Sequence, residues 1–170
     1  MGSMLHESGA NRGAAPRPTR VKGPTVVYLW GMHFEHSVPI AAPPQQVFDR
    51  YVDVERWPEW LETMTSVERL DDGPLRVGSR TRIKQPKLPV AVWEVTALET
   101  GRSWTWVAKG PGIVTTASHV VDPAGDGSRV TASLDQAGPL GGVLGRLTRG
   151  MTDRYLQIEG DSLRAQFERG

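Results

Sequence analysis

The stretch SVPIAAPPQQVFDRYVDVERWPEW, residues 37–60, contains the features that decide the fold. It opens with alternating apolar and polar residues, which predict the end of a strand. Two adjacent prolines suit the start of a helix, and Val47, Phe48 and Tyr51 follow as an apolar stripe at helical spacing. Pro58 then prevents a helix from running straight through. The stretch therefore predicts a strand, a helix, a corner and a second short helix.

Two tryptophans, Trp57 and Trp60, flank the corner at Pro58 among several charged residues. An indole ring carries a large apolar surface, and burying that surface is favourable. We therefore expect both rings to anchor the helical corner onto the open edge of a sheet.

Beyond residue 63 the apolar period changes to two, and turn signals recur at short intervals. Strands are predicted at residues 33–40, 65–70, 77–85, 90–98, 103–109, 113–121 and 128–136. Turns of hairpin length, such as DPAGDG, join the later strands. The sheet is therefore predicted to be an antiparallel meander.

A long helix is predicted over the last thirty or so residues, because one apolar stripe spans about 80° at 100° per residue. The stripe consists of Leu140, Leu144, Leu147, Met151, Tyr155 and Ile158. Beyond Gly160 the apolar residues move to the side of Leu156, which indicates either a bend or a frayed end. Only this helix is long enough to cover one face of the sheet. The predicted fold class is α+β, with a curved antiparallel sheet wrapped around a long C-terminal helix and two short helices after the first strand.

Length and composition predict one folded domain with a preceding tail. The first 32 residues are rich in Gly, Pro, Arg and Ala without an apolar period, which predicts a disordered N-terminal tail, either a tag remnant or an upstream extension. Residues 25–31 are an alternative added strand, and a secretory signal is the weakest interpretation. The folded domain is expected at 33–170. No run is long and apolar enough for a membrane span, and the absence of cysteine suits a cytoplasmic location.

This order of elements resembles the START-related helix-grip superfamily (SRPBCC proteins), in particular its polyketide cyclase/dehydrase-like branch. The matching pieces are residues 37–60, GSRTRI at 78–83, VWEVTALETGRSWTW at 92–106, DGSRVTASL at 126–134 and the long closing helix. The resemblance implies a curved sheet that grips the helix around a hydrophobic cavity. Members bind lipids, polyketides, plant hormones or other apolar small molecules, and a minority catalyse cyclisation or dehydration. The resemblance alone does not decide between a binder and an enzyme.

His119 is the strongest candidate for chemistry in such a cavity. Its alternation places it on the inner face of its strand with Ala117 and Val121. An imidazole there can donate a hydrogen bond to a ligand carbonyl or transfer a proton. The alternative is that His119 is a core residue whose imidazole forms a hydrogen bond with a neighbouring backbone group. No acid partner for His119 is identifiable from spacing, so no catalytic triad is predicted.

The remaining candidates for ligand contact are amides, aromatic rings and residues of the helix. Gln85 and Gln136 share the inner face and need partners, because an unpaired buried amide costs about 1–3 kcal/mol. Alternatives are ordered water or a turn backbone. The expected wall of the cavity is formed by Trp93, Trp104 and Trp106, with Met151 and Tyr155 opposite on the long helix. Each tryptophan is equally compatible with the core.

The first functional hypothesis is a protein that binds or carries a small hydrophobic molecule, lipid- or polyketide-like, without a metal or organic cofactor. The alternative is a polyketide cyclase, aromatase or dehydratase with His119 as general acid/base. A regulator that uses the outward basic row of Arg80, Arg82 and Lys84 is a weaker third hypothesis. The net charge of +1 gives no long-range attraction to nucleic acid, and none is expected as a partner. A monomer or weak homodimer is expected.

Overall fold

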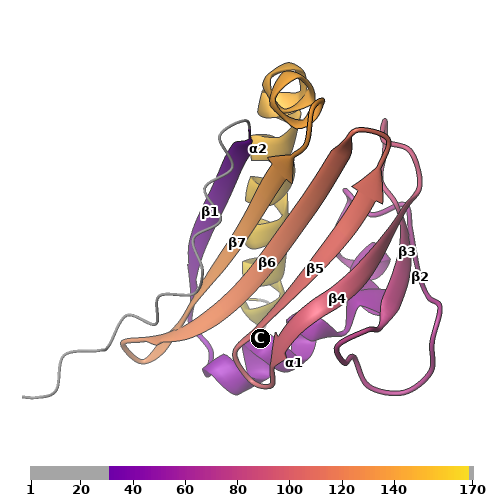
Figure 1. Cartoon of the computed structure of the whole chain (residues 1–170). Coiled ribbons are helices and arrows are strands. Elements are labelled where there is room, and N and C mark those ends of the chain that lie inside the picture. The colour runs from indigo at the N-terminus through magenta and orange to yellow at the C-terminus, as the bar shows by residue number, and fades with distance from the viewer. Residues whose placement is uncertain (1–30, 169–170) are drawn as a thin grey trace, which may run out of the picture.

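The computed structural model describes residues 31–168 and forms one seven-stranded antiparallel sheet with a long helix on one face (Figure 1). The elements are β1 (Met32–Ile40), α1 (Pro44–Val52), η1 (Val54–Glu59), β2 (Ser66–Arg69), β3 (Arg80–Lys84), β4 (Ala91–Glu99), β5 (Ser103–Gly110), β6 (Ile113–Ala124), β7 (Gly127–Ala137) and α2 (Gly141–Glu168). The predicted fold class is confirmed. The predicted tail and the alternative strand at residues 25–31 fall almost entirely outside the described residues.

Strands β2 to β7 form a meander, and β1 extends the sheet at one edge by pairing with β7. The strand order is β1-β7-β6-β5-β4-β3-β2. Val38 lies opposite Val130 in the register of β1 and β7, and both side chains are buried. On β3, Thr81 and Ile83 are buried whereas Arg80 and Arg82 are exposed, as the alternation predicts. The period of two therefore identifies the inner face of the sheet correctly.

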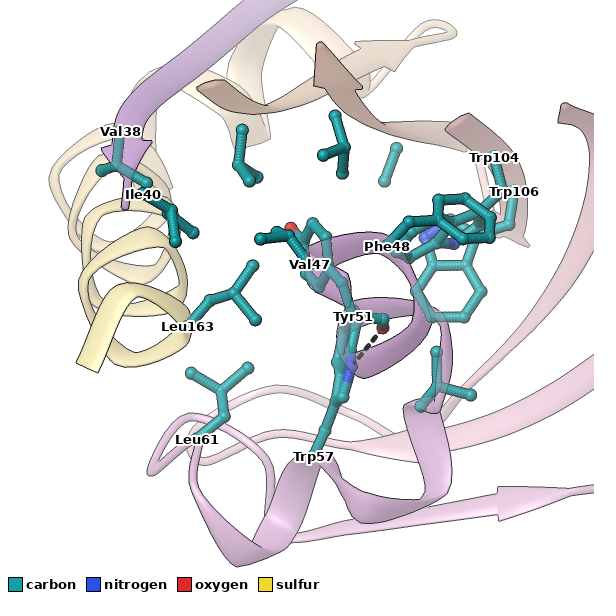
Figure 2. Close-up of a cluster of buried hydrophobic side chains, with 14 of the residues drawn as sticks. Val38, Ile40, Val47, Phe48, Tyr51, Trp57, Leu61, Trp104, Trp106 and Leu163 are labelled. Carbon is teal, nitrogen blue, oxygen red and sulfur yellow. Dashed lines mark hydrogen bonds between the residues drawn. The ribbon is translucent and has the colours of Figure 1, made fainter. Parts of the chain in front are cut away.

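The corner after α1 is built around Trp57. The indole Nε1 donates a hydrogen bond of 2.9 Å to the backbone oxygen of Tyr51, and the ring stacks on the Tyr51 ring at 5.6 Å between centroids (Figure 2). Trp57 is only 1% exposed. The corner lies beside β2, an edge strand of the sheet, and the Trp57 ring reaches from there into the core. Trp60 is half-buried and lies under the guanidinium of Arg50.

Helix α2 packs on the sheet with a face that differs from the predicted one. Its buried residues are Gly141, Gly145, Leu156, Glu159, Gly160 and Leu163. At 100° per residue these six fall within about 100°, and their centre lies about 120° from the predicted leucine stripe. Leu140, Leu144 and Leu147 are exposed instead.

The glycines explain this difference. A Cβ on Gly145 would lie 2.5 Å from Met32 Cγ, and one on Gly160 would lie 3.0 Å from Val38 Cγ1. The backbone of α2 therefore approaches β1 more closely than any side chain on that face would allow. An apolar-stripe count misses a face of this kind, because glycine contributes no side chain to it. The buried face is continuous through Gly160, so neither a bend nor a frayed end is needed.

The core lies between α1, the corner, the inner face of the sheet and the second half of α2. Figure 2 shows Val38, Ile40, Leu61 and Leu163 on one side of Tyr51 and Trp57, and the indoles of Trp104 and Trp106 on the other. Aromatic rings thus fill the middle of this core, and a small pocket lies beside them.

Candidate functional site

A small pocket lies between the inner face of the sheet and the middle of α2. Its volume is about 50 Å³. It is lined by Trp57, Met64, Ile83, Gln85, Trp93, Trp106, Ala117, His119, Ser133, Leu134, Leu156 and Glu159. Most of these residues are apolar or aromatic, and the polar ones are Gln85, His119, Ser133 and Glu159.

His119, Glu159 and Tyr51 form a buried polar cluster beside the pocket. Nε2 of His119 lies 3.3 Å from Oε1 of Glu159, and the Tyr51 hydroxyl donates a short hydrogen bond to the same oxygen. All three residues are buried. A carboxylate in an apolar interior requires such partners, because an unpaired buried charge is very costly.

The pKa of the Tyr51 hydroxyl is raised well above its ordinary value of 10.0. Burial is the largest cause, followed by the negative charge of Glu159 and by the hydrogen bond to that carboxylate. Tyr51 therefore remains a hydrogen-bond donor throughout the neutral and mildly alkaline range.

Aromatic rings enclose the His119 imidazole. Trp104 stacks on it with 4.3 Å between centroids and 13° between planes. Trp106 and Trp57 approach it at 5.6 and 5.8 Å. The His119 Nδ1 atom is buried and has no hydrogen-bond partner within residues 31–168. A buried nitrogen without a partner is a natural contact point for a ligand or a water molecule.

The structure brings four of the predicted site residues together. Gln85, Trp93, Trp106 and His119 all line the pocket. Trp93, Trp106 and His119 come from the neighbouring strands β4, β5 and β6, and Gln85 directly follows β3.

The other four predicted site residues lie away from this pocket. Trp104 is fully buried behind His119. Gln136 faces the first half of α2, where its Oε1 lies 2.9 Å from the position of a Cβ on Gly145. Met151 and Tyr155 do not form the opposite wall, because α2 turns its glycine face toward the sheet. Tyr155 instead donates a hydrogen bond of 2.9 Å from its hydroxyl to the backbone oxygen of Pro86.

Leu156 and Glu159 form the wall of the pocket opposite the sheet. The sequence pattern does not identify Glu159, Tyr51 or Trp57 as site residues. Leu156, Glu159 and Leu163 share one face at helical spacing, so the only signal for Glu159 was its position between two buried leucines. A glutamate on a helix is ordinarily exposed to solvent. The sequence pattern indicates only a packing role for Tyr51 and Trp57, and both side chains do pack in the core.

The cluster can supply acid–base chemistry, whereas no metal site is evident. The described part of the chain holds no group of three or more metal-ligating side chains. Nor does any helix among residues 31–168 combine the length and the apolar character that a membrane crossing requires. On the outer face, Arg82 of the basic row pairs with Glu68 at 2.5 Å, and the Lys84 ammonium donates to the backbone oxygen of Leu88. The row is therefore partly satisfied within the fold.

Comparison with known proteins adds a family and a set of related folds. A family model described as "Polyketide cyclase / dehydrase and lipid transport" matches residues 32–168. A "Putative polyketide cyclase" from Streptomyces halstedii is 34% identical over 77 residues, which is 45% of this chain and 60% of that protein. The chain thus aligns with less than two thirds of the length of this relative.

Solved structures share the fold at low sequence identity. A protein of Helicobacter pylori described as hypothetical has a TM-score of 0.72 at 14% identity, covering 91% of this chain and 99% of that one. The Zhui aromatase/cyclase from Streptomyces sp. R1128 has a TM-score of 0.67 at 16% identity, covering 82% and 94%. A START superfamily protein from Mycobacterium smegmatis has a TM-score of 0.64 at 17% identity, covering 80% and 97%.

Proposed function

Because the chain belongs to the polyketide cyclase/dehydrase and lipid transport family, we propose that it binds a small hydrophobic molecule, lipid- or polyketide-like, between its sheet and α2. The observation that carries the proposal is the pocket beside His119. Three indoles, from Trp57, Trp93 and Trp106, line it together with aliphatic side chains. Pockets of this composition bind apolar ligands and orient them with a few polar groups.

The polar groups of the pocket define the end of the ligand that binds there. Glu159 offers a carboxylate that accepts hydrogen bonds, and Gln85 offers an amide that can donate or accept. A ligand with one hydroxyl or carbonyl on an otherwise apolar body would complement these groups. His119 Nδ1, which is buried without a partner in the part of the chain described, is the third contact point in this proposal.

The size of the pocket requires the fold to open when a ligand enters. About 50 Å³ is well below the roughly 300–1,000 Å³ of pockets that enclose a drug-sized ligand. The polar end of the ligand occupies the present pocket, and the remainder requires α2 to separate from the loop between β3 and β4. The Tyr155–Pro86 hydrogen bond joins these two segments and must break in that step.

A titration of tryptophan fluorescence tests the proposal, with palmitate and 2-naphthol as probes of the two ligand classes. Ala117 is buried and lines the pocket, so Ala117→Leu fills the space with a side chain. We expect wild type to bind one of the probes and Ala117→Leu to bind it at least about tenfold more weakly, or roughly 1.4 kcal/mol. Ala97→Leu, on the exposed outer face of β4, is the matched control.

Two results would contradict this function. One is the absence of any fluorescence change across chain lengths of fatty acid and sizes of fused ring, together with no co-purified molecule in native mass spectrometry. The other is binding that Ala117→Leu leaves unchanged although the variant folds normally by circular dichroism.

The His119–Glu159 pair favours a second candidate function, catalysis of cyclisation, aromatisation or dehydration of a polyketide-like chain. If Nε2 carries a proton toward the carboxylate, Nδ1 is left with a free lone pair that can accept a proton from substrate. Glu159 would then orient the ring and stabilise the imidazolium. His119 would take a proton from a carbon between two carbonyls, and the resulting enolate would attack a further carbonyl of the same chain, which closes the ring. The alkoxide formed takes the proton back from the imidazolium, and the hydroxyl then leaves as water together with a proton of the adjacent carbon, which creates a double bond in the ring.

The catalytic candidate requires turnover to depend on His119 more than binding does. With a poly-β-ketone thioester as substrate, we expect His119→Ala to abolish turnover while ligand affinity stays within about tenfold. Glu159→Gln should lower kcat and leave KM nearly unchanged. Turnover by His119→Ala at the wild-type rate would exclude this role, and binding without turnover in wild type would leave only the first function.

A further inference from the structure

The first half of α2 exposes an apolar surface that neither the pocket nor the core uses. Leu140, Val143, Leu144 and Leu147 are 47%, 58%, 36% and 78% exposed. At 100° per residue the four side chains fall within about 100° of arc, so they form one continuous face. We call these four residues the leucine face. Val90, in the neighbouring loop before β4, is 55% exposed.

The packing of the opposite side of α2 fixes the leucine face outward. Gly141 and Gly145 are buried, and a Cβ on either would meet Gln136 or Met32 within about 3 Å. The backbone N–H of Leu140 also donates a hydrogen bond of 2.9 Å to the Gly112 oxygen. The helix cannot rotate its leucines inward without losing these close contacts. Their exposure is therefore a property of the fold.

The charges around the leucine face are positive. No Asp or Glu occurs between residues 136 and 152. At 100° per residue, Arg146 lies about 60° from the edge of the leucine face, whereas Arg149 lies on the opposite side of the helix. At the same end of the sheet, Lys87 lies in the β3–β4 loop and Lys109 near the end of β5, and neither this loop nor the β5–β6 turn contains an acid (Figure 1). The nearest acid on the helix, Asp153, lies 3.9 Å from Arg149. The chain as a whole has a net charge of only +1, so this positive charge is local.

We propose that the leucine face docks on an anionic lipid surface. An interfacial helix places apolar residues at the boundary of headgroups and acyl chains while arginines reach the headgroup phosphates. The four exposed side chains and Arg146 of α2 meet this description, and Lys87 and Lys109 add positive charge at the same end of the sheet.

A second copy of the chain fits this surface less well. Four side chains on one convex helix expose only part of the roughly 800 Å² per partner that a stable protein interface buries. A two-fold symmetric contact through this face would also bring Arg146 close to Arg146 of the other copy, and like charges oppose such a contact. A bilayer imposes neither condition.

Docking would bring the pocket to the membrane. The first turns of α2 lie at the end of the sheet where β7 ends, which is also the end that carries the β3–β4 loop contacted by Tyr155. The proposal does not depend on the identity or the existence of a ligand, because lipid binding is measured on the protein alone. Its failure is thus separable from failure of the proposed function.

The test is co-sedimentation of the full chain with vesicles of pure phosphatidylcholine and of phosphatidylcholine with 30 mol% phosphatidylglycerol, about 30% being enough to make a surface negative. We expect binding to the anionic vesicles, and this binding should weaken as the concentration of sodium chloride rises.

Leu147→Glu should lower the partition coefficient at least about tenfold. Val77→Glu is the matched control, since Val77 is 61% exposed in the β2–β3 loop at the other end of the sheet. Arg146→Glu should weaken the preference for anionic vesicles.

Three outcomes would overturn the proposal. The first is no binding to anionic vesicles at low salt. The second is equal binding by wild type and Leu147→Glu, which would assign any binding to another part of the chain. The third is a dimer, or a complex with an acidic protein, that Leu147→Glu dissociates while vesicle binding is unchanged. Light scattering and circular dichroism on each variant establish its mass and fold.

Discussion

Tyr51 and His119 both approach the same oxygen of Glu159, and this contact decides what the interior of the protein can do. A buried carboxylate next to three indoles is unstable unless donors surround it. Tyr51 provides one donor from α1, and its ring also packs against Trp57 and Trp104. One side chain thus supports the core and maintains the polar end of the pocket.

Removing the Tyr51 hydroxyl should destabilise the fold. We expect Tyr51→Phe to lower the free energy of unfolding by about 1–3 kcal/mol, because Glu159 loses a hydrogen bond in a buried place. Urea denaturation at pH 7 measures the change. Tyr155→Phe is the control, since that hydroxyl bonds at the surface and should cost less than about 1 kcal/mol. Equal effects of the two substitutions would show that Glu159 does not need Tyr51.

The pH dependence of the same residue has a definite sign. The pKa of Tyr51 in the folded protein is raised above the ordinary value of 10.0, so folding favours the protonated phenol. That contribution to stability is fully present below pH 10 and is lost as the pH rises above it. We expect the thermal midpoint of wild type to fall more steeply above pH 10 than that of Tyr51→Phe. Parallel melting curves from pH 8 to 11 would contradict this.

Glu159 shows why single site residues are hard to predict from sequence. A glutamate on a helix fits the apolar–polar pattern of the sequence whether its side chain faces water or the interior. Only the residues that it contacts in the folded protein decide between the two orientations. Those partners, Tyr51 and His119, lie 108 and 40 residues away along the chain. His119 itself was identifiable, because alternation on a strand fixes the face of each residue regardless of distant contacts.

At the scale of elements, the strands followed their sequence pattern and α2 did not. Each strand has only two faces, and turns such as the one at Gly125 and Asp126 set where it ends. A helix can pack with any face around its axis, and α2 packs with the face that carries its glycines instead of the face that carries its leucines. Close backbone packing therefore outweighed the burial of larger side chains in this half of the helix.

Substitution of two glycines in α2 tests this account. Gly150 has nothing within 4 Å of its Cβ position, so Gly150→Ala should stabilise the protein by up to about 1 kcal/mol through helix propensity alone. Gly145→Ala gains the same propensity, but its methyl group meets Met32 and Gln136. We expect it to be at least about 1 kcal/mol less stable than Gly150→Ala by chemical denaturation, since overpacking typically costs about 1–3 kcal/mol. Equal gains for both would mean that α2 does not pack closely through Gly145.

At the scale of the molecule, the sheet, the corner and α2 enclose less space than a complete ligand would occupy. The proposed opening involves two segments that one hydrogen bond joins, Tyr155 on α2 and Pro86 in the β3–β4 loop. Lys87 follows Pro86 with a φ of +63°, a conformation that side chains rarely adopt. This loop is therefore held in place at some cost in strain.

Loss of the Tyr155 hydroxyl should ease this opening. We expect Tyr155→Phe to increase hydrogen exchange at residues 85–90. It should also raise the rate constant for association of the ligand probe by a few fold. Exchange in the loop between β2 and β3, at the other end of the sheet, is the internal control and should not change. An unaltered exchange pattern at residues 85–90 would show that this contact does not limit opening.

The pairing of β1 with β7 also determines how the chain assembles. Residues 32–40 lie opposite residues 128–136, whereas every other strand pairs with its neighbour in sequence. Hairpins between neighbours form early because the loops they close are short, and contacts between distant segments form more slowly. Folding thus begins in the meander, and β1 cannot pair until residues 128–136 have been synthesised. Until then β1 has no partner strand, and this is the interval in which a molecular chaperone would matter most.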